Sequence, residues 1–277
     1  MERLAEFETL YLDLPAEGVG MLTLNRPHQG NGVVPELIRD MLACLDQVDA
    51  DLGIRVLVIT GAGKTFCAGA DLDAMKTYLD ERMAIEEEPF NARLLAPVTP
   101  RLRNLRIPTI AALNGAATAG GFDMSLACDM RIAARSARVG ETYIRLGLAP
   151  GNGGAYLMPR LVGSGIAAEL AFTGDLIGAE RALKLGLLND VVDDDKLFET
   201  VLALASRIAA YPRKALEATK HLLRASWETD LNGSMSASYW ATSTLQYSAD
   251  FREGVEAALA KRTPAYNRRD RNTKPSR

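Results

Sequence analysis

The sequence predicts an α/β protein with parallel strands, followed by a region that contains helices alone. Up to about residue 195, short apolar runs typical of strands alternate with segments whose apolar residues recur at helical spacing. Beyond that point the strand-like runs stop and amphipathic helical segments follow one another. We therefore expect a core over residues 1–195 and a helical oligomerisation region over residues 196–277.

The elements of the core are separated by proline and glycine. The run "VGMLTLNRP" alternates at strand period and stops at Pro27, and the helical pattern "PELIRDMLACLDQVDADL" begins with Pro35, which suits a first helical turn. Three continuous apolar runs, "RVLVITGAG", "PTIAALNG" and "CDMRIAA", predict buried strands. Helical patterns between these runs begin at Asp73, within residues 90–105 and at Asp123.

The region after the core holds the segments "KLFETVLALASRIAAYP", "RKALEATKHLLRAS", "NGSMSASYWATSTLQYS" and "ADFREGVEAALAKR", and each predicts a helix. Their apolar faces include Leu202, Leu204, Ile208, Trp240 and Leu245. Such faces either fold back on the core or bury against another subunit, and the pattern leaves both options open.

Composition excludes several classes of function. The 277 residues are 48% hydrophobic and carry a formal net charge of −3 with both signs mixed, which argues against a nucleic-acid partner. No run approaches the ~18 apolar residues of a membrane span, and the N-terminus lacks the pattern of a targeting signal. Three widely spaced cysteines without a CxxC pair indicate reduced thiols and a cytoplasmic location. The two histidines, His28 and His221, do not form a metal cluster.

Two glycine-rich turns carry the chemistry. "GKTFCAGADLDAM" follows the strand-like run "RVLVIT", and "NGAATAGGFDM" follows "PTIAAL". Two backbone amides aimed at one point make an oxyanion hole, and the start of a helix adds its dipole to that effect. Each turn alone would also fit a simple helix start, and Asp123 would then be only a cap.

Taken together and in order, several blocks resemble the crotonase superfamily, the enoyl-CoA hydratase/isomerase family. They are "LNRP", "FCAGADL", "NGAATAGGFDMSLACDMRIA", "GLAPGNGGAYLMPRLVG", "TGDLIGAERALKLGLLNDVV" and "YSADFREGVEAALAKRTPAY". The resemblance covers roughly the whole chain. It implies a spiral of ββα units with a C-terminal helical trimerisation region, in trimers that often pair into hexamers. It also implies acyl thioesters of coenzyme A as substrates and no separate cofactor, since coenzyme A is part of the substrate.

The resemblance assigns the oxyanion-hole amides to Ala70 and Gly120. Hydratases of the family carry two glutamates, and the matching positions here are Asp123 and Tyr143. Aspartate can still act as a base, whereas tyrosine, with an ordinary pKa of ~10, is better suited to donate a proton or orient water. Asp123, Glu141 and Tyr143 are therefore the candidate catalytic residues.

Glu141 stands two residues before Tyr143. If this segment is extended, both side chains point to the same face, and Glu141 can supply the missing carboxylate. The alternative is a surface glutamate or a partner of Arg138.

Further positions match the family's substrate site more loosely. The turns contribute Ala68, Asp71 and Gly121, although Asp71 also fits a structural role. Asn152 and Tyr156 are expected to face the acyl chain, and residues 82–97 match a variable segment over the acyl pocket. Lys261 matches a lysine that reaches the coenzyme A nucleotide of a neighbouring subunit.

Together with the resemblance, these residues predict an enoyl-CoA hydratase-type lyase that acts through an enolate held in the oxyanion hole. The alternatives are an enoyl-CoA isomerase, an acyl-CoA hydrolase, and an acyl-CoA binding protein without activity. Dienoyl-CoA isomerases of the family carry a further aspartate where this chain has Gly151, which speaks against a copy of their mechanism. The expected partners are the acyl-CoA substrate and further copies of the chain, as a trimer or a dimer of trimers.

Overall fold

A computed structural model describes residues 2–82 and 97–266. Most of the segment expected over the acyl pocket, 83–96, and the basic tail, 267–277, lie outside the described residues.

The main sheet has seven strands in the described residues, in the order β1-β2-β3-β4-β6-β8-β11. All pairs from β3 to β11 are parallel, and β1 and β2 add an antiparallel edge. The parallel strands of the sequence analysis are therefore confirmed. The strands are β1 (Glu2–Glu6), β2 (Leu10–Ala16), β3 (Val19–Leu24), β4 (Val56–Gly61), β6 (Thr109–Leu113), β8 (Met130–Ala134) and β11 (Asp190–Val192).

A second, smaller sheet has the order β10-β9-β7-β5. It contains β5 (Thr65–Cys67), β7 (Ala116–Thr118), β9 (Arg138–Gly140) and β10 (Ile177–Gly178). The chain visits both sheets in turn: β4 leads to β5 and then a helix, β6 to β7 and then a helix, and β8 to β9 and then a helical turn. This repetition is the spiral of ββα units that the resemblance implies, and the fold class is confirmed.

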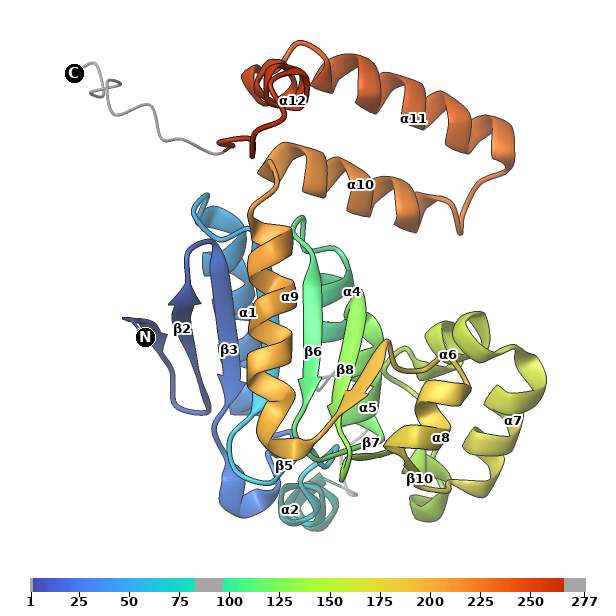
Figure 1. The fold of residues 1–277 in the computed structure, drawn as a ribbon. Coiled ribbons are helices and arrows are strands. Elements are labelled where there is room, and N and C mark those ends of the chain that lie inside the picture. The colour runs from blue at the N-terminus through green and yellow to red at the C-terminus, as the bar shows by residue number, and fades with distance from the viewer. Residues whose placement is uncertain (1, 83–96, 267–277) are drawn as a thin grey trace.

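Helices cover both faces of the main sheet. In Figure 1, α9 crosses the front face, and α1 and α4 lie behind the sheet. In the described residues up to 195, the helices are α1 (Pro35–Ala50), α2 (Leu72–Arg82), α4 (Val98–Arg103), α5 (Gly120–Ala127), α6 (Gly154–Val162), α7 (Ser164–Thr173) and α8 (Ala179–Lys184). Short 3-10 helices lie at η1 (Pro27–Gln29), η2 (Thr142–Leu146) and η3 (Asp194–Lys196).

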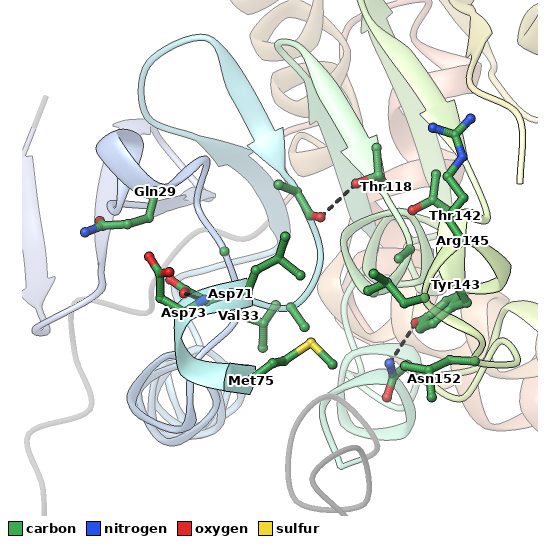
Figure 2. Close-up of a pocket in the computed structure, with 18 of the residues that line it drawn as sticks. Gln29, Val33, Asp71, Asp73, Met75, Thr118, Thr142, Tyr143, Arg145 and Asn152 are labelled. Carbon is green, nitrogen blue, oxygen red and sulfur yellow. Dashed lines mark hydrogen bonds between the residues drawn. The ribbon is translucent and has the colours of Figure 1, made fainter. Parts of the chain in front are cut away.

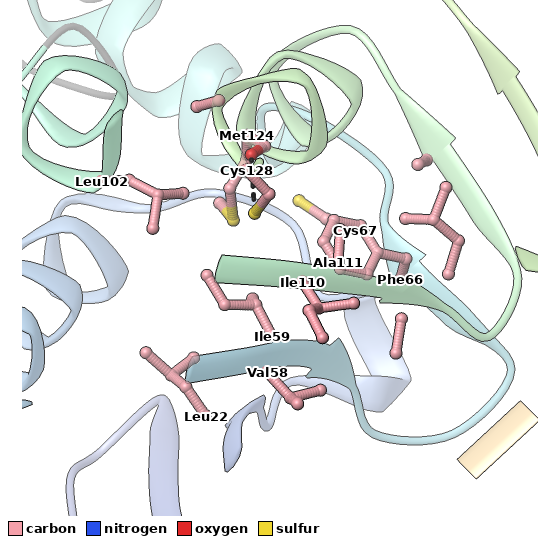
Figure 3. Packing of buried hydrophobic residues seen from close by; sticks show 14 of the residues in the cluster. Leu22, Val58, Ile59, Phe66, Cys67, Leu102, Ile110, Ala111, Met124 and Cys128 are labelled. Atoms are coloured by element: carbon pink, nitrogen blue, oxygen red, sulfur yellow. Dashed lines mark hydrogen bonds between the residues drawn. The ribbon is translucent and has the colours of Figure 1, made fainter. Parts of the chain in front are cut away.

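The core lies on both faces of the main sheet, against α9 on one side and α1 and α4 on the other. Every residue of β3, β4 and β6 is buried. Burial on both faces explains why β4 and β6 read as continuous apolar runs, and β3 is buried on both faces although its sequence alternates. Figure 3 shows Leu22, Ile59 and Ile110 of neighbouring strands in one cluster with Cys67 and Cys128. Burial of a side chain such as leucine contributes about 1.5–3 kcal/mol, so this cluster holds the strands that carry the turns.

The last four helices differ in whether they pack against the core. They are α9 (Leu197–Ala209), α10 (Arg213–Ala225), α11 (Leu231–Leu245) and α12 (Ala249–Leu259). On α9, Leu202, Leu204 and Ile208 pack against the core, so this helix folds back. On α11, Trp240 is 68% exposed, and Figure 1 shows α10, α11 and α12 beyond the end of the sheet. The division at residue 195 stays a prediction.

Within the described residues, no helix combines the length and the apolar character needed to cross a membrane. Cys44, Cys67 and Cys128 are free and buried. Burial raises the pKa of the Cys44 thiol to about 12 and that of the Cys67 thiol to about 11, which disfavours the reactive thiolate.

Candidate active site

The two glycine-rich turns lie side by side because the strands that lead into them are neighbours. β5 and β7 pair in parallel, so both turns leave the same edge of the small sheet. The hydroxyl of Thr118 donates a hydrogen bond to the carbonyl of Ala68 at 2.8 Å and joins them, as Figure 2 shows. A Cβ at Gly69 would lie 2.9 Å from the Thr118 carbonyl oxygen and 3.5 Å from the Gly120 nitrogen, so only glycine permits this approach.

A cavity of about 540 Å³ opens at this edge. Its size is that of a small-molecule site, and Figure 2 shows its walls. Six of the residues singled out in the sequence analysis line it, namely Ala68, Ala70, Asp71, Gly120, Tyr143 and Asn152.

The backbone amides of Ala70 and Gly120 are suited to act as donors. Val33 and Ala70 form a parallel bridge, but its hydrogen bonds use the carbonyl of Gly69 and the amide of Asp71. The bridge therefore leaves the Ala70 amide unused. Gly120 is the first residue of α5, where an amide has no acceptor within the helix. Both residues line the cavity, next to the starts of α2 and α5, whose dipoles favour negative charge.

Ala119 holds the second turn in an unusual conformation that the sequence analysis missed. Its φ of 46° with ψ of −121° is a region that residues with a side chain rarely adopt. Its amide donates to the carbonyl of Gly140 at 2.9 Å, which ties the turn to β9. Strain of this kind gathers at functional sites, and here it sets the direction of the next amide, that of Gly120.

Asp123 is not a helix cap. The N-cap of α5 is Ala119, and Asp123 lies within the first turn with its own amide bonded to the Ala119 carbonyl at 2.9 Å. Its side chain is fully buried and accepts a hydrogen bond from the Tyr143 hydroxyl at 2.5 Å. The carboxylate of Asp123 is thus directed at Tyr143 rather than at the start of its helix.

The segment from Glu141 to Tyr143 is not extended, because β9 ends at Gly140 and η2 begins at Thr142. Glu141 is nevertheless fully buried beside Asp123. This burial excludes a surface position, and Arg138 donates to the Leu176 carbonyl while neither Glu141 oxygen has a hydrogen-bond partner among the described residues.

The carboxyl groups of Asp123 and Glu141 face one another across Gly154. A Cβ at Gly154 would overlap both Asp123 Oδ1 and Glu141 Oε1, so glycine is required there. Neither of these oxygens, nor Glu141 Oε2, has a hydrogen-bond donor among the described residues. One proton held between the two groups would satisfy two of these oxygens. The sequence analysis missed Gly154, because nothing next to it in the chain shows what it faces.

The two carboxyl groups differ in their affinity for that proton. Burial raises the pKa of Asp123 to about 6, and the hydrogen bond from Tyr143 limits the rise. Burial and then the charge of Asp123 raise the pKa of Glu141 to about 10. Near neutral pH, Asp123 is therefore the anion and Glu141 holds the proton. Burial, followed by the Asp123 charge, also raises the pKa of Tyr143, so its phenol stays neutral.

Asn152 orients the phenol. Its side-chain amide donates to the Tyr143 oxygen at 2.7 Å, which leaves the phenol proton for Asp123. Thr99 on α4 donates to the Asn152 carbonyl at 2.6 Å and holds the loop before α6 in place. The sequence analysis expected Asn152 at the acyl chain, and its place in the cavity wall also supports Tyr143.

Two of the predicted substrate residues have clear structural contacts. Asp71 accepts from the amides of Asp73 and Ala74 at the start of α2 and forms an ion pair with Arg26 at 3.0 Å. A Cβ at Gly121 would overlap the Cys67 carbonyl, so Gly121 allows α5 to approach β5 and does not line the cavity.

Two others lie away from the cavity in this chain. Tyr156 packs against Trp227, with ring centroids 6.4 Å apart, under the guanidinium of Arg160. Lys261 is exposed after the end of α12. Its expected contact is with a neighbouring subunit, and this contact stays a prediction.

No cluster of three or more His, Cys, Asp or Glu side chains suited to a metal ion occurs in the part of the chain that the structure describes.

A sequence model of the family described as Enoyl-CoA hydratase/isomerase matches residues 15–269. The chain belongs to this family. It is an enzyme family, and the fold and the paired turns described above agree with the match.

Characterised relatives of the family include both reaction types. The chain is 38% identical to the 1,2-epoxyphenylacetyl-CoA isomerase of Escherichia coli, over 90% of this chain and 95% of the relative. It is 34% identical to the crotonyl-CoA hydratase of Syntrophomonas wolfei, over 92% of this chain and 96% of the relative. Among solved structures, the enoyl-CoA hydratase of Bacillus anthracis matches with a TM-score of 0.87 and 34% identity, over 94% of this chain and 99% of the other.

Proposed function

We propose that the protein is an enoyl-CoA hydratase-type lyase, which adds water to an enoyl thioester or removes it. One observation carries this proposal: the amides of Ala70 and Gly120 share one cavity with Tyr143, and Asp123 lies directly behind Tyr143. The cavity thus combines donors for a thioester oxygen with a group that can move a proton.

The two parts of the site act on the same reaction step. Addition or removal of a proton beside a thioester builds negative charge on the thioester oxygen. Amide donors placed in advance stabilise that charge, by about 3–4 kcal/mol per donor in other enzymes. Acid/base groups contribute about 10²–10⁴-fold more. Coenzyme A is part of the substrate, so this chemistry needs no separate cofactor.

An enoyl-CoA isomerase is the second candidate, and the burial of the acid/base groups favours it. Asp123 and Glu141 are fully buried, and of the three candidate catalytic residues Tyr143 alone lines the cavity. Movement of a double bond needs one proton-exchanging group, whereas hydration also needs a positioned water molecule.

A panel of enoyl- and cyclic acyl-CoA thioesters in deuterated water separates these candidates. Hydration yields a 3-hydroxyacyl product, isomerisation places deuterium without adding oxygen, and hydrolysis releases free coenzyme A. A protein that binds the thioesters without turnover would contradict both candidates and indicate an acyl-CoA binding protein.

We also propose a trimer or a dimer of trimers in the cytoplasm. The exposed apolar side chains of α11 and α12 support the assembly, and they are Leu231, Met235, Tyr239, Trp240, Phe251, Val255 and Leu259. Light scattering at micromolar concentration should give three or six times the mass of the chain. A monomer under these conditions would contradict the proposal.

A further inference from the structure

We propose that Tyr143 exchanges the proton with the substrate, while the buried pair of Asp123 and Glu141 takes up and returns the proton of Tyr143. This inference rests on the proposed acyl-CoA chemistry of the same cavity. It assigns the contact with the substrate to a tyrosine, whereas the resemblance assigns it to a carboxylate.

The first argument is access. Asp123 and Glu141 have no exposed surface, whereas Tyr143 is 6% exposed and lines the cavity. Asp123 Oδ2 is occupied by the Tyr143 hydroxyl, and Asp123 Oδ1 lies against Glu141 and Gly154. A bound thioester therefore meets the phenol before it meets either carboxyl group.

The second argument is the direction of the hydrogen bonds at the phenol. The Asn152 amide can only donate to the phenol oxygen, so the phenol proton points to Asp123. A phenol oxygen has a second lone pair, and Tyr143 lines the cavity. Figure 2 shows Tyr143 and Asn152 joined in the cavity wall. The phenol oxygen is thus set to accept a proton on one side while it gives one up on the other.

The proton transfer balances within the residues described. A C–H bond next to the thioester breaks, and its proton forms an O–H bond with Tyr143. The former phenol proton moves at the same time to Asp123 Oδ2. The electron pair of the C–H bond becomes the enolate, whose charge lies near the amides of Ala70 and Gly120. The reverse steps return the proton to the substrate, and the phenol remains neutral throughout.

Glu141 acts through Asp123 and is a positioning residue. It keeps its own proton and so leaves the pair with a single negative charge, since two adjacent buried anions are strongly disfavoured. When Asp123 receives the proton of Tyr143, that buried charge disappears as the enolate charge forms. The raised pKa values of Glu141 and Tyr143 agree with this distribution of protons.

Tyr143→Phe tests the path, because it keeps the ring and removes only the hydroxyl. We expect kcat to fall about 10²–10⁴-fold, with the affinity for a saturated acyl-CoA nearly unchanged. Asp123→Asn in the Tyr143→Phe background should lower kcat little further, since both residues act on one path. Tyr11→Phe is the matched control on the distant strand β2 and should keep full activity.

A proton inventory in mixtures of light and heavy water adds a second readout. In the proposed step the phenol proton, which exchanges with solvent, moves together with the carbon-bound proton, which does not. We therefore expect kcat to fall linearly with the deuterium fraction, and to fall as well for a substrate deuterated next to the thioester. A kcat that does not depend on the deuterium fraction, or a Tyr143→Phe variant with wild-type kcat, would overturn the proposal in favour of direct contact by Asp123.

Infrared spectroscopy separates this inference from the proposed function. A protonated carboxyl band near neutral pH that disappears in Glu141→Gln supports the shared proton, and its absence contradicts it. If the wild type converts none of the thioesters, the proposed function is wrong, and this band alone then decides whether the carboxyl pair holds a proton.

Discussion

The two ends of α5 hold acidic side chains in opposite settings. At the start of the helix, Asp123 is fully buried and faces a second acid, Glu141. Just beyond its end, Asp129 accepts from the amide and hydroxyl of Thr109 and forms an ion pair with the buried Lys220 at 2.8 Å.

This difference separates a chemical role from a structural one. The Asp129 carboxylate has a cation and two donors, and it ties α10 to the main sheet. The Asp123 carboxylate has a phenol and another acid, and burial makes its protonation easy near neutral pH. Asp123, which faces the carboxyl group of Glu141, can hold an exchangeable proton. Asp129, which faces the ammonium group of Lys220, instead holds α10 against the main sheet.

The largest effect is expected for Asp123→Asn, which keeps the shape of the side chain and removes its exchange of protons. Turnover should fall about 10²–10⁴-fold, with acyl-CoA affinity nearly unchanged and thermal stability equal or higher. Steady-state kinetics and calorimetry measure both. Asp129→Asn is the matched control, and it should lose stability while each folded molecule keeps its activity. Full turnover in Asp123→Asn would contradict the chemical role that separates Asp123 from Asp129.

Lys220→Met tests the structural side of the comparison. The variant fills the same space but leaves Asp129 without its cation and the Ile107 carbonyl without the Lys220 donor. We expect a loss of about 1–3 kcal/mol in the free energy of unfolding, measured by urea denaturation. An unchanged free energy would show that this ion pair contributes nothing beyond packing.

Glu141→Gln should change how stability depends on pH. The pKa of Glu141 is about 10 in the folded protein and 4.5 ordinarily. The stability of the wild type that depends on this group is therefore fully present below pH 4.5 and is lost as pH rises toward 10. Glutamine does not ionise, so the Glu141→Gln variant does not lose this stability as pH rises. The variant should therefore gain on the wild type by up to about 1.4 kcal/mol per pH unit across this range, measured by urea denaturation at several pH values.

The same variant separates two roles for Glu141. Glutamine imitates the protonated acid, so turnover near neutral pH should stay within about tenfold of the wild type. If Glu141→Gln loses turnover and Asp123→Asn keeps it, Glu141 is the base.

The smallest effect is expected for Asn152→Leu, which removes the donor that orients Tyr143. A misdirected phenol proton should lower kcat about threefold to tenfold, with KM nearly unchanged, because a single neutral hydrogen bond contributes about 1 kcal/mol. A variant that raises KM without lowering kcat would instead place Asn152 at the acyl chain.

Much of the fold could be predicted from local patterns. Pro27 and Pro35 are the first residues of η1 and α1, and the apolar runs are the buried parallel strands. The Ala70 and Gly120 turns could be predicted because each pairs a strand end with glycine and a helix start. Ala119 and Gly154 could not, since their roles depend on Gly140 and on two carboxyl groups distant in the chain.

The sequence by itself determined the family, the alternation of strands and helices, and the residue types available for chemistry. Tertiary structure alone decided that Glu141 lies against Asp123, that Tyr143 stands between them and the cavity, and that Tyr156 packs on Trp227. The physical reason is that backbone conformation and amphipathic pattern are local properties of the chain. A proton's position depends instead on burial and on neighbours brought together from separate segments, and these exist only once the chain has folded.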